Sequence, residues 1–158
     1  MAVQSHDLEA RIDRLESQQE LHRLVSEYCH GCDKHDIERF LAIWHDDAVW
    51  EIGPPFGTFK GKQEIRRAME EHIWPAWRET HHWTTNLVVD INGDRAHGVC
   101  DVNCNGASPE DVALLVSATY TDDFERRNGQ WGITRREVVI HYFSPVPGVD
   151  LAPPPPMP

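Results

Sequence analysis

The sequence predicts an α+β domain, in which helices precede a curved, largely antiparallel sheet. In the first half of the chain, apolar residues recur at helical spacing, whereas the part after Glu79 consists of long extended runs separated by turn residues. Asn92-Gly93 and Asn128-Gly129 are two-residue hairpin signals, and residues 107–111 form a longer turn. Helices laid across the concave side of a coiled sheet enclose a space. We therefore expect an internal pocket.

The composition limits the class of partner. A chain of 158 residues fits one domain. Its 15 Lys and Arg against 26 Asp and Glu give a formal net charge of -11, whereas phosphate binding depends on clustered basic side chains. Nucleic acid and anionic membranes are therefore not predicted as partners. Because no apolar run approaches the ~20 residues of a membrane span, and Met1–Glu20 is too charged for a signal peptide, we expect a cytoplasmic protein.

The helical pattern at the N-terminus contains a signal for a new helix start. Leu8, Ile12 and Leu15 recur at helical spacing, and Ser17–Glu20 then has the form of a capping box. We therefore expect residues 1–16 to form a separate helical arm that packs on a neighbouring subunit, followed by the main domain at residues 17–145. The second helix has an apolar stripe formed by Leu21, Leu24, Val25, Tyr28 and Cys32.

Two helices and two short strands are expected before the sheet proper. A short helix is predicted over Asp36–Trp44, extended structure at Ala48–Ile52, and a turn with a short strand at Phe56–Gly61. Lys62–Ile73 is helical again, and Pro75 kinks or ends that helix.

Four long strands complete the domain. Their predicted ranges are Glu79–Ile91, Arg95–Gly106, Val112–Arg127 and Gln130–Ser144. The remaining residues, 146–158, form a proline-rich tail that we expect to be extended or disordered.

The first long strand carries a row of polar, uncharged side chains. Because successive strand residues point to opposite faces, Thr80, His82, Thr84 and Asn86 share one face. Such a row is either a solvent face or the lining of a polar cavity. We favour the cavity, because helices are expected to lie across this sheet.

The four cysteines predict no metal site. Cys29-x-x-Cys32 has the spacing of a zinc or redox motif, but it lies in a helical pattern without the preceding strand of a thioredoxin-like motif. Cys100 and Cys104 would lie ~13 Å apart on one strand face, which is too far to bind one metal ion together. We interpret all four as small buried hydrophobic residues, and we predict neither a metal nor a cofactor.

Several motifs resemble those of a known family. They are Gly31–Lys34, Ile43–Trp50, Trp74-Pro75, Glu79–Leu87, Tyr120-Thr121, Phe124–Trp131, Tyr142–Pro145 and Ala152–Pro154. Together they resemble the SnoaL-like branch of the nuclear transport factor two-like superfamily, and within it the γ-hexachlorocyclohexane dehydrochlorinases, over residues 17–154. The resemblance implies a cone-shaped, curved, mixed sheet wrapped by the N-terminal helices around a deep pocket. It also implies a homo-oligomer, with a trimer favoured and a dimer possible.

The same resemblance implies a set of site residues. The catalytic histidine of the family falls on His82, its catalytic aspartate on Asp33, and a basic residue of the last strand on Arg136. The dehydrochlorinases have a lysine where this chain has Tyr28. The set of tyrosine, aspartate and histidine resembles that of bile-acid and scytalone dehydratases, which favours loss of water over loss of chloride. The pocket-lining, substrate-binding positions fall on Trp50, Ile73, Trp77, Thr80, Val102, Cys104, Val116 and Ile140.

The chemistry of two of these residues fits proton abstraction. His82 can take and return a proton near neutral pH, and a carboxylate on its other nitrogen would fix the ring and stabilise the imidazolium. Asp33 is the candidate carboxylate, although it also lies where a cap for the next helix belongs. The alternative for His82 is a solvent-facing or hydrogen-bonded sheet histidine.

The other two candidates have roles toward oxygen. The Tyr28 phenol could hydrogen-bond a substrate carbonyl or protonate a leaving hydroxyl, or it could be an ordinary core tyrosine. Arg136 alternates with Val138, Ile140 and Tyr142, so it faces inward if Ile140 does. It would then stabilise an enolate or phenolate, or pair with an acidic side chain.

Three tryptophans could frame an aromatic ligand. They are Trp50, Trp77 and Trp83, although tryptophan is more often part of the core. His81 points away from His82, so the two neighbouring histidines are poorly placed to coordinate one metal ion together.

The first hypothesis is a cofactor-independent lyase of the dehydratase type that acts on a small apolar or aromatic substrate. A carbon–carbon lyase (deformylating or retro-aldol), a dehydrohalogenase or an isomerase would use the same residues. The second hypothesis is a non-catalytic protein that binds a hydrophobic ligand or assembles with an oxygenase. In each case a small molecule occupies the pocket.

Overall fold

The computed structural model describes residues 2–149 and 151–152, with side chains from residue 7 onward. The predicted tail at 146–158 lies in part outside these residues, so its conformation stays a prediction. Within the described part, no helix combines the length and the apolar character needed to cross a membrane.

Six strands form one sheet in the order β2-β1-β6-β5-β4-β3. All neighbours are antiparallel except β1 and β6, which are parallel. The predicted class, α+β with a curved, mixed and largely antiparallel sheet, is confirmed, and the four long strands match their predicted ranges within a residue or two. The strands are β1 (Trp44–Gly53), β2 (Gly57–Lys60), β3 (Glu79–Asn92), β4 (Arg95–Ala107), β5 (Ala113–Arg127) and β6 (Gln130–Pro145).

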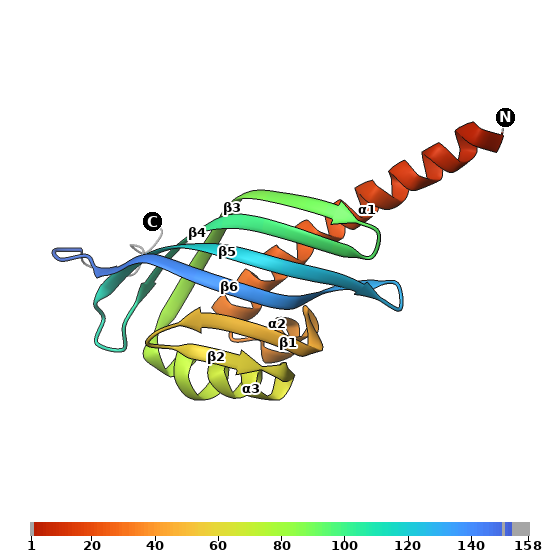
Figure 1. Ribbon diagram of the computed structural model, residues 1–158. Helices are drawn as coiled ribbons and strands as arrows, with labels where there is room; N and C mark the ends of the chain where they lie inside the picture. The colour runs from red at the N-terminus through yellow and green to blue at the C-terminus, as the bar shows by residue number, and fades with distance from the viewer. Residues whose placement is uncertain (1, 150, 153–158) are drawn as a thin grey trace, which may run out of the picture.

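The helices lie across one side of this sheet (Figure 1). Figure 1 shows the C-terminal half of α1 behind the long strands and α3 beside β1 and β2. Pro75 lies in the second of two short turns that follow α3, where the predicted helix ends. The helical elements are α1 (Ala2–Asp33), α2 (Ile37–Ala42), α3 (Gly61–Ala68), a π-helical turn (Met69–Ile73) and a 3-10 turn (Trp74–Ala76).

The predicted helix start at Ser17 is wrong, because α1 continues through it from Ala2 to Asp33. A capping serine is needed only where backbone N–H groups lack carbonyl partners, and here the preceding turns supply them. Ser17 is buried instead, and its hydroxyl accepts a hydrogen bond of 3.3 Å from Arg126.

The N-cap of α2 is Asp36 and not Asp33. The Asp36 carboxylate accepts a hydrogen bond from the backbone N–H of Arg39 at 3.0 Å, and α2 begins directly after it. The predicted helix over Asp36–Trp44 is therefore shorter, because Trp44 already begins β1. Asp33, which the sequence left open as a cap, is the last residue of α1 and is free for another role.

The two hairpin signals have different outcomes. Asn128 and Gly129 form the two-residue loop between β5 and β6, with φ of 53° and 78°, as a type I′ turn requires. Between β3 and β4 the loop is Gly93-Asp94, one residue later than the Asn-Gly signal, because Asn92 still belongs to the strand.

A β-bulge in β6 changes which side chains face inward. Ala118 pairs with Ile140 but Ser117 pairs with Tyr142, so His141 is an extra residue on β6. The alternation predicted from Arg136 to Tyr142 therefore breaks after Ile140, and Tyr142 is 45% exposed.

The core lies between α1 and the concave side of the sheet. Four of the five residues of the predicted α1 stripe are buried, and Leu24 packs against the core from its edge. The four cysteines are buried and free, as predicted. Gly31 is needed where α1 meets α2, since a Cβ there would lie 2.7 Å from the backbone N and Cα of Phe40.

We expect Gly31→Ala to lower the free energy of unfolding by about 1–3 kcal/mol, because the added methyl group must push α1 away from α2. Helix propensity alone would change stability in the opposite direction, by up to about 1 kcal/mol. Urea denaturation measures the effect, with the exposed neighbour His30→Ala as the control, which should change it by less than about 0.5 kcal/mol. A Gly31→Ala protein as stable as the parent would contradict this close packing.

Candidate active site

A cavity of about 100 Å³ lies between the end of α1, the turns after α3 and the concave side of the sheet. This is several times the roughly 10–15 Å³ that one water molecule needs on the same measure. All eight residues predicted to line the pocket do line it, as do Tyr28 and His82. No Asp, Glu, Lys or Arg side chain lines it among the residues that the structure describes.

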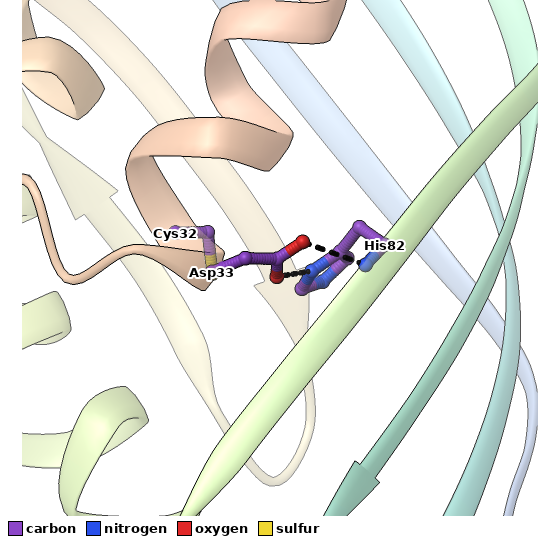
Figure 2. Close-up of side chains that lie close together, drawn as sticks. All are labelled: Cys32, Asp33 and His82. Carbon is purple, nitrogen blue, oxygen red and sulfur yellow. Dashed lines mark hydrogen bonds and ion pairs between the residues drawn. The ribbon is translucent and has the colours of Figure 1, made fainter. Parts of the chain in front are cut away.

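The His82 imidazole and the Asp33 carboxylate meet beside this cavity (Figure 2). His82 Nδ1 lies 2.5 Å from Oδ1 of Asp33, and the His82 backbone N–H donates to Oδ2 at 2.8 Å. The Thr80 hydroxyl donates to Oδ1, also at 2.8 Å. Since Thr80 and His82 alternate on β3, one strand face supplies the two side chains that contact the carboxylate.

The end of α1 positions Asp33 through local backbone geometry. His35, two residues later, is in the left-handed region with φ of 53°, as is common just past a helix end. The backbone N–H of Asp36 donates to the carbonyl of Gly31 at 3.0 Å, which closes the last turn. This turn directs the Asp33 side chain toward β3 (Figure 2).

The electrostatics of the pair favour an ionised carboxylate. Burial acts to raise the pKa of Asp33, but the hydrogen bonds and the charge interaction with His82 outweigh it, and the pKa of Asp33 lies below its ordinary value. An ionised Asp33 accepts the proton on Nδ1, so in the neutral ring the other nitrogen, Nε2, is the acceptor. No described residue hydrogen-bonds to Nε2, and the His82 ring lines the cavity.

Tyr28 is a buried hydrogen-bond donor close to His82. The two ring centroids lie 6.2 Å apart with the rings nearly perpendicular, and Tyr28 lines the cavity. Burial raises the pKa of Tyr28 far above its ordinary value, although the charge of Arg136 acts in the opposite direction. The phenol therefore stays protonated.

Arg136 does not line the cavity. Its Nε and Nη2 donate to the two carboxylate oxygens of Asp122, at 2.7 and 2.6 Å, and both residues are fully buried. The guanidinium also lies over the rings of Tyr28 and Tyr120, at 4.2 and 4.3 Å from their centroids. The structure thus gives Arg136 the alternative role, pairing with an acidic side chain, and its effect on the pocket passes through the two tyrosines.

The three candidate tryptophans are separated. Trp50 and Trp77 line the cavity, whereas Trp83 is on the other face of β3, is exposed and contacts the ring of His81. Trp83 therefore does not frame a ligand in this pocket.

Cys32, Asp33 and His82 are the one group of potential metal ligands among the described residues, with donor atoms within 4.8 Å of one another. Their chemistry fits a metal poorly. Both Asp33 oxygens already accept hydrogen bonds, and burial raises the pKa of the Cys32 thiol well above its ordinary value, whereas metal binding needs the thiolate. The group is better suited to hydrogen bonding.

Sequence reasoning missed some lining residues for two reasons. Simple strand alternation with the predicted positions would have found Ile52, Ala118, Tyr120 and Val138. Phe143 lines the cavity in place of Tyr142 because of the bulge in β6, which no local signal announced. The remaining members come from the turns and from the end of α1, and they are Cys32, Phe56 and Trp74.

Comparisons with known proteins agree with this fold. The model of the SnoaL-like domain matches residues 13–137. Hexachlorocyclohexane dehydrochlorinase 1 of Sphingobium indicum is 36% identical over 145 residues, which are 90% of this chain and 94% of that protein. A gamma-hexachlorocyclohexane dehydrochlorinase of the same species is 34% identical, over 90% of this chain and 92% of that protein.

A solved structure gives the same result in three dimensions. The crystal structure of a hexachlorocyclohexane dehydrochlorinase, LinA type 2, superposes with a TM-score of 0.87 at 36% identity and covers 91% of this chain and 98% of that one. The family match spans most of the chain, and it includes α2, the whole cavity-forming part of β3 to β5, and both members of the Asp33–His82 pair. This chain belongs to the SnoaL-like domain family.

Proposed function

We propose that this protein is a cofactor-independent lyase that eliminates a leaving group from a small, uncharged, largely apolar or aromatic substrate. The observation that carries the proposal is the 2.5 Å contact between His82 Nδ1 and Asp33, which leaves Nε2 as an acceptor at an apolar cavity. The relatives named as dehydrochlorinases support the same reaction class.

His82 is the base in the proposed reaction. Its Nε2 takes a proton from a carbon atom of the substrate, the C–H electrons form the new double bond, and the leaving group departs with its bonding electrons. Asp33 stabilises the imidazolium, as the carboxylate of a catalytic triad does. His82 then releases its proton, so the cycle closes with no net change in the protein.

Tyr28 makes loss of water the favoured version of this reaction. A departing hydroxyl must gain a proton, and a buried phenol that stays protonated can hydrogen-bond to the oxygen as charge develops on it. The reaction is balanced, because one proton leaves the carbon atom with His82 and one proton is gained by the departing hydroxyl. Arg136, stacked on the Tyr28 ring, holds that ring in place and does not contact the substrate.

Dehydrohalogenation is the second candidate, and the comparisons favour it. The 36% identical relative is named a hexachlorocyclohexane dehydrochlorinase. A halide leaves without a proton, so His82 and Asp33 would serve both reactions equally, while the Tyr28 phenol would matter less.

We expect His82→Ala to lower kcat by about 100- to 10,000-fold, because it removes the base. The assay measures elimination and solvent deuterium exchange on a panel of aromatic β-hydroxy compounds and chlorinated cyclohexanes. His81→Ala is the matched control, since His81 is the neighbouring residue on the opposite, exposed face and should leave the rate unchanged. A wild-type protein that binds these compounds but turns none over, with equal binding by His82→Ala, would instead indicate a non-catalytic pocket.

Tyr28→Phe distinguishes the two leaving groups. The variant keeps the ring and its stacking on Arg136 but loses the hydroxyl. We expect kcat on hydroxyl-bearing substrates to fall about 10- to 100-fold, with a much smaller change on chlorinated substrates. Comparable losses on both classes would contradict a specific role for the phenol in removing water.

The lowered pKa of Asp33 predicts a pH dependence of stability. An acid with a lowered folded-state pKa adds stability above its ordinary value of 3.8, and this contribution disappears as the pH falls through the lower folded value. The difference in unfolding free energy between wild type and Asp33→Asn should thus shrink as the pH falls below 3.8. Chemical denaturation from pH 3 to 7 measures it. A difference that stays constant to pH 3 would count against an ionised, hydrogen-bonded Asp33.

A further inference from the structure

Two tyrosines from different layers of the fold lie side by side at the wall of the cavity. Tyr28 belongs to α1 and Tyr120 to β5, and both line the cavity. Their ring centroids are 5.4 Å apart, and the residues are only 3% and 4% exposed. A buried phenol needs a hydrogen-bond partner, because an unpaired hydroxyl in an apolar site costs free energy. The pair can meet this need in series, if one hydroxyl donates to the other and the second donates to a molecule in the cavity.

One positive charge acts on both rings. The Arg136 guanidinium lies 4.2 and 4.3 Å from the ring centroids of Tyr28 and Tyr120, and Asp122 holds it there through Nε and Nη2. Its third nitrogen, Nη1, is buried without a hydrogen-bond partner in the described part of the chain. A cation at a phenol ring favours the phenolate over the neutral form. Arg136 thus stabilises negative charge on these oxygens without lining the cavity itself.

The two phenols differ in acidity. Burial raises the pKa of both far above the ordinary value, and the charge of Arg136 acts in the opposite direction on both. A hydrogen-bonding interaction between the hydroxyls then lowers the pKa of Tyr28 and raises the pKa of Tyr120. These are the effects of Tyr120 as donor and Tyr28 as acceptor, because a donated hydrogen bond stabilises the anion of the group that accepts it. Tyr28 is therefore the better acid of the pair.

Tyr28 is also the phenol next to the base. Its ring centroid is 6.2 Å from that of His82, whereas Tyr120 has no ring contact with His82 among the described residues. In an elimination the departing proton and the leaving group are on neighbouring carbon atoms, so the acid and the base must lie close together. The better acid is thus beside the base, and Tyr120 contacts the acid.

We propose that Tyr120 is a positioning residue that makes Tyr28 the general acid of the elimination, an inference that rests on the proposed function. Tyr120 donates a hydrogen bond to the Tyr28 oxygen, which directs the Tyr28 proton to the leaving group. Tyr120 and Arg136 then stabilise the phenolate that remains. A halide leaves without a proton, whereas a hydroxyl needs one. The substrate class is therefore a compound with a hydroxyl on the carbon atom next to the acidic C–H.

The proton transfers balance without a co-reactant. His82 takes the proton from carbon, and the C–H electron pair forms the double bond while the C–O bond breaks with its electron pair on oxygen. The Tyr28 O–H bond breaks at the same time, its proton completes a water molecule, and its electron pair stays on the phenol oxygen. The imidazolium proton then passes to this oxygen through the product water, so both groups return to their starting state.

Help from Tyr120 is needed because burial makes a phenol a weaker acid. An ordinary phenol, with a pKa of about 10, readily protonates a departing hydroxide, whose conjugate acid has a pKa of about 15.7. Burial narrows this difference for Tyr28. The hydrogen bond from Tyr120 and the charge of Arg136 restore part of it, so loss of the Tyr120 hydroxyl should slow only reactions that use the Tyr28 proton.

The first test measures kcat on a β-hydroxy aryl ketone and on its β-chloro analogue. Tyr120→Phe keeps the ring that contacts Arg136 and removes only the hydroxyl. We expect kcat to fall about 3- to 10-fold on the hydroxy compound, the effect of one hydrogen bond, and to stay unchanged on the chloro compound. The double variant with Tyr28→Phe should be no slower than Tyr28→Phe alone, because Tyr120 acts through Tyr28. Tyr142→Phe, an exposed tyrosine outside the cavity, is the control and should leave all rates unchanged.

The contrary outcomes of this test are distinct. Additive losses in the double variant would overturn the positioning role, because Tyr120 would then act on the substrate itself. Equal losses on the two compounds would overturn it as well, because they indicate a role in packing. A wild type that removes chloride but never the hydroxyl overturns the acid role of Tyr28 and leaves the elimination by His82 intact. A wild type that is inactive on both compounds contradicts the proposed function, and the inference with it.

The second test does not depend on activity. The chain has three tyrosines, so carbon-13 labelling of the tyrosine Cζ atoms gives three NMR signals, and Tyr142→Phe identifies the one outside the cavity. Tyr120→Phe should shift the Tyr28 signal, because the Tyr28 oxygen loses a hydrogen bond, whereas Tyr142→Phe should leave it in place. A Tyr28 signal that stays in place in Tyr120→Phe would show that the two hydroxyls are not hydrogen-bonded, which overturns the proposal.

Discussion

The hydrogen bonds of Asp33 join the helical layer to the sheet and orient the proposed base at the same time. One carboxylate, at the end of α1, accepts the Thr80 hydroxyl, the His82 backbone N–H and the proton on His82 Nδ1. If α1 slid or rotated, a partly buried charge would lose these partners, at a cost of about 1–3 kcal/mol for each unsatisfied group. The same contacts therefore determine the position of the helix, the tautomer of the imidazole and the direction of its free nitrogen.

The environment of this pair strengthens it. The buried charge of Arg136, which lies over the rings of Tyr28 and Tyr120, is neutralised by Asp122 through two hydrogen bonds. The wall that a substrate meets is thus mostly aromatic and aliphatic. In such a medium of low polarity the attraction between Asp33 and an imidazolium is larger than in water, which suits a base that becomes charged only during the reaction.

The differences between the predicted and the observed elements have one physical origin. A capping signal is a few residues long, and it starts a helix only if the chain before it is not helical. The residues before Ser17 are already helical, so the signal there has no effect. Asp33 and Asp36 both met the local rule for an N-cap of α2. In the folded protein it is Asp36 that accepts the hydrogen bond from the backbone N–H of Arg39.

Strand alternation failed at two bulges. On β3, Asn86 was predicted on the face of His82, but the register shifts after Thr85, so Asn86 is exposed and Leu87 packs against the core. On β6, an extra residue at His141 turned Phe143 inward and Tyr142 outward.

The sequence by itself determined the class of the fold, the ranges of the long strands and the face shared by Thr80 and His82, because periodicity and turn chemistry are local properties. The resemblance to a family, and not any spacing, predicted that Asp33 would meet His82 across 49 positions. Only the tertiary structure decided the partner of Arg136, the cap of α2 and the lining by Phe143. Each of these depends on the packing and register of segments far apart in the chain, which no local pattern encodes.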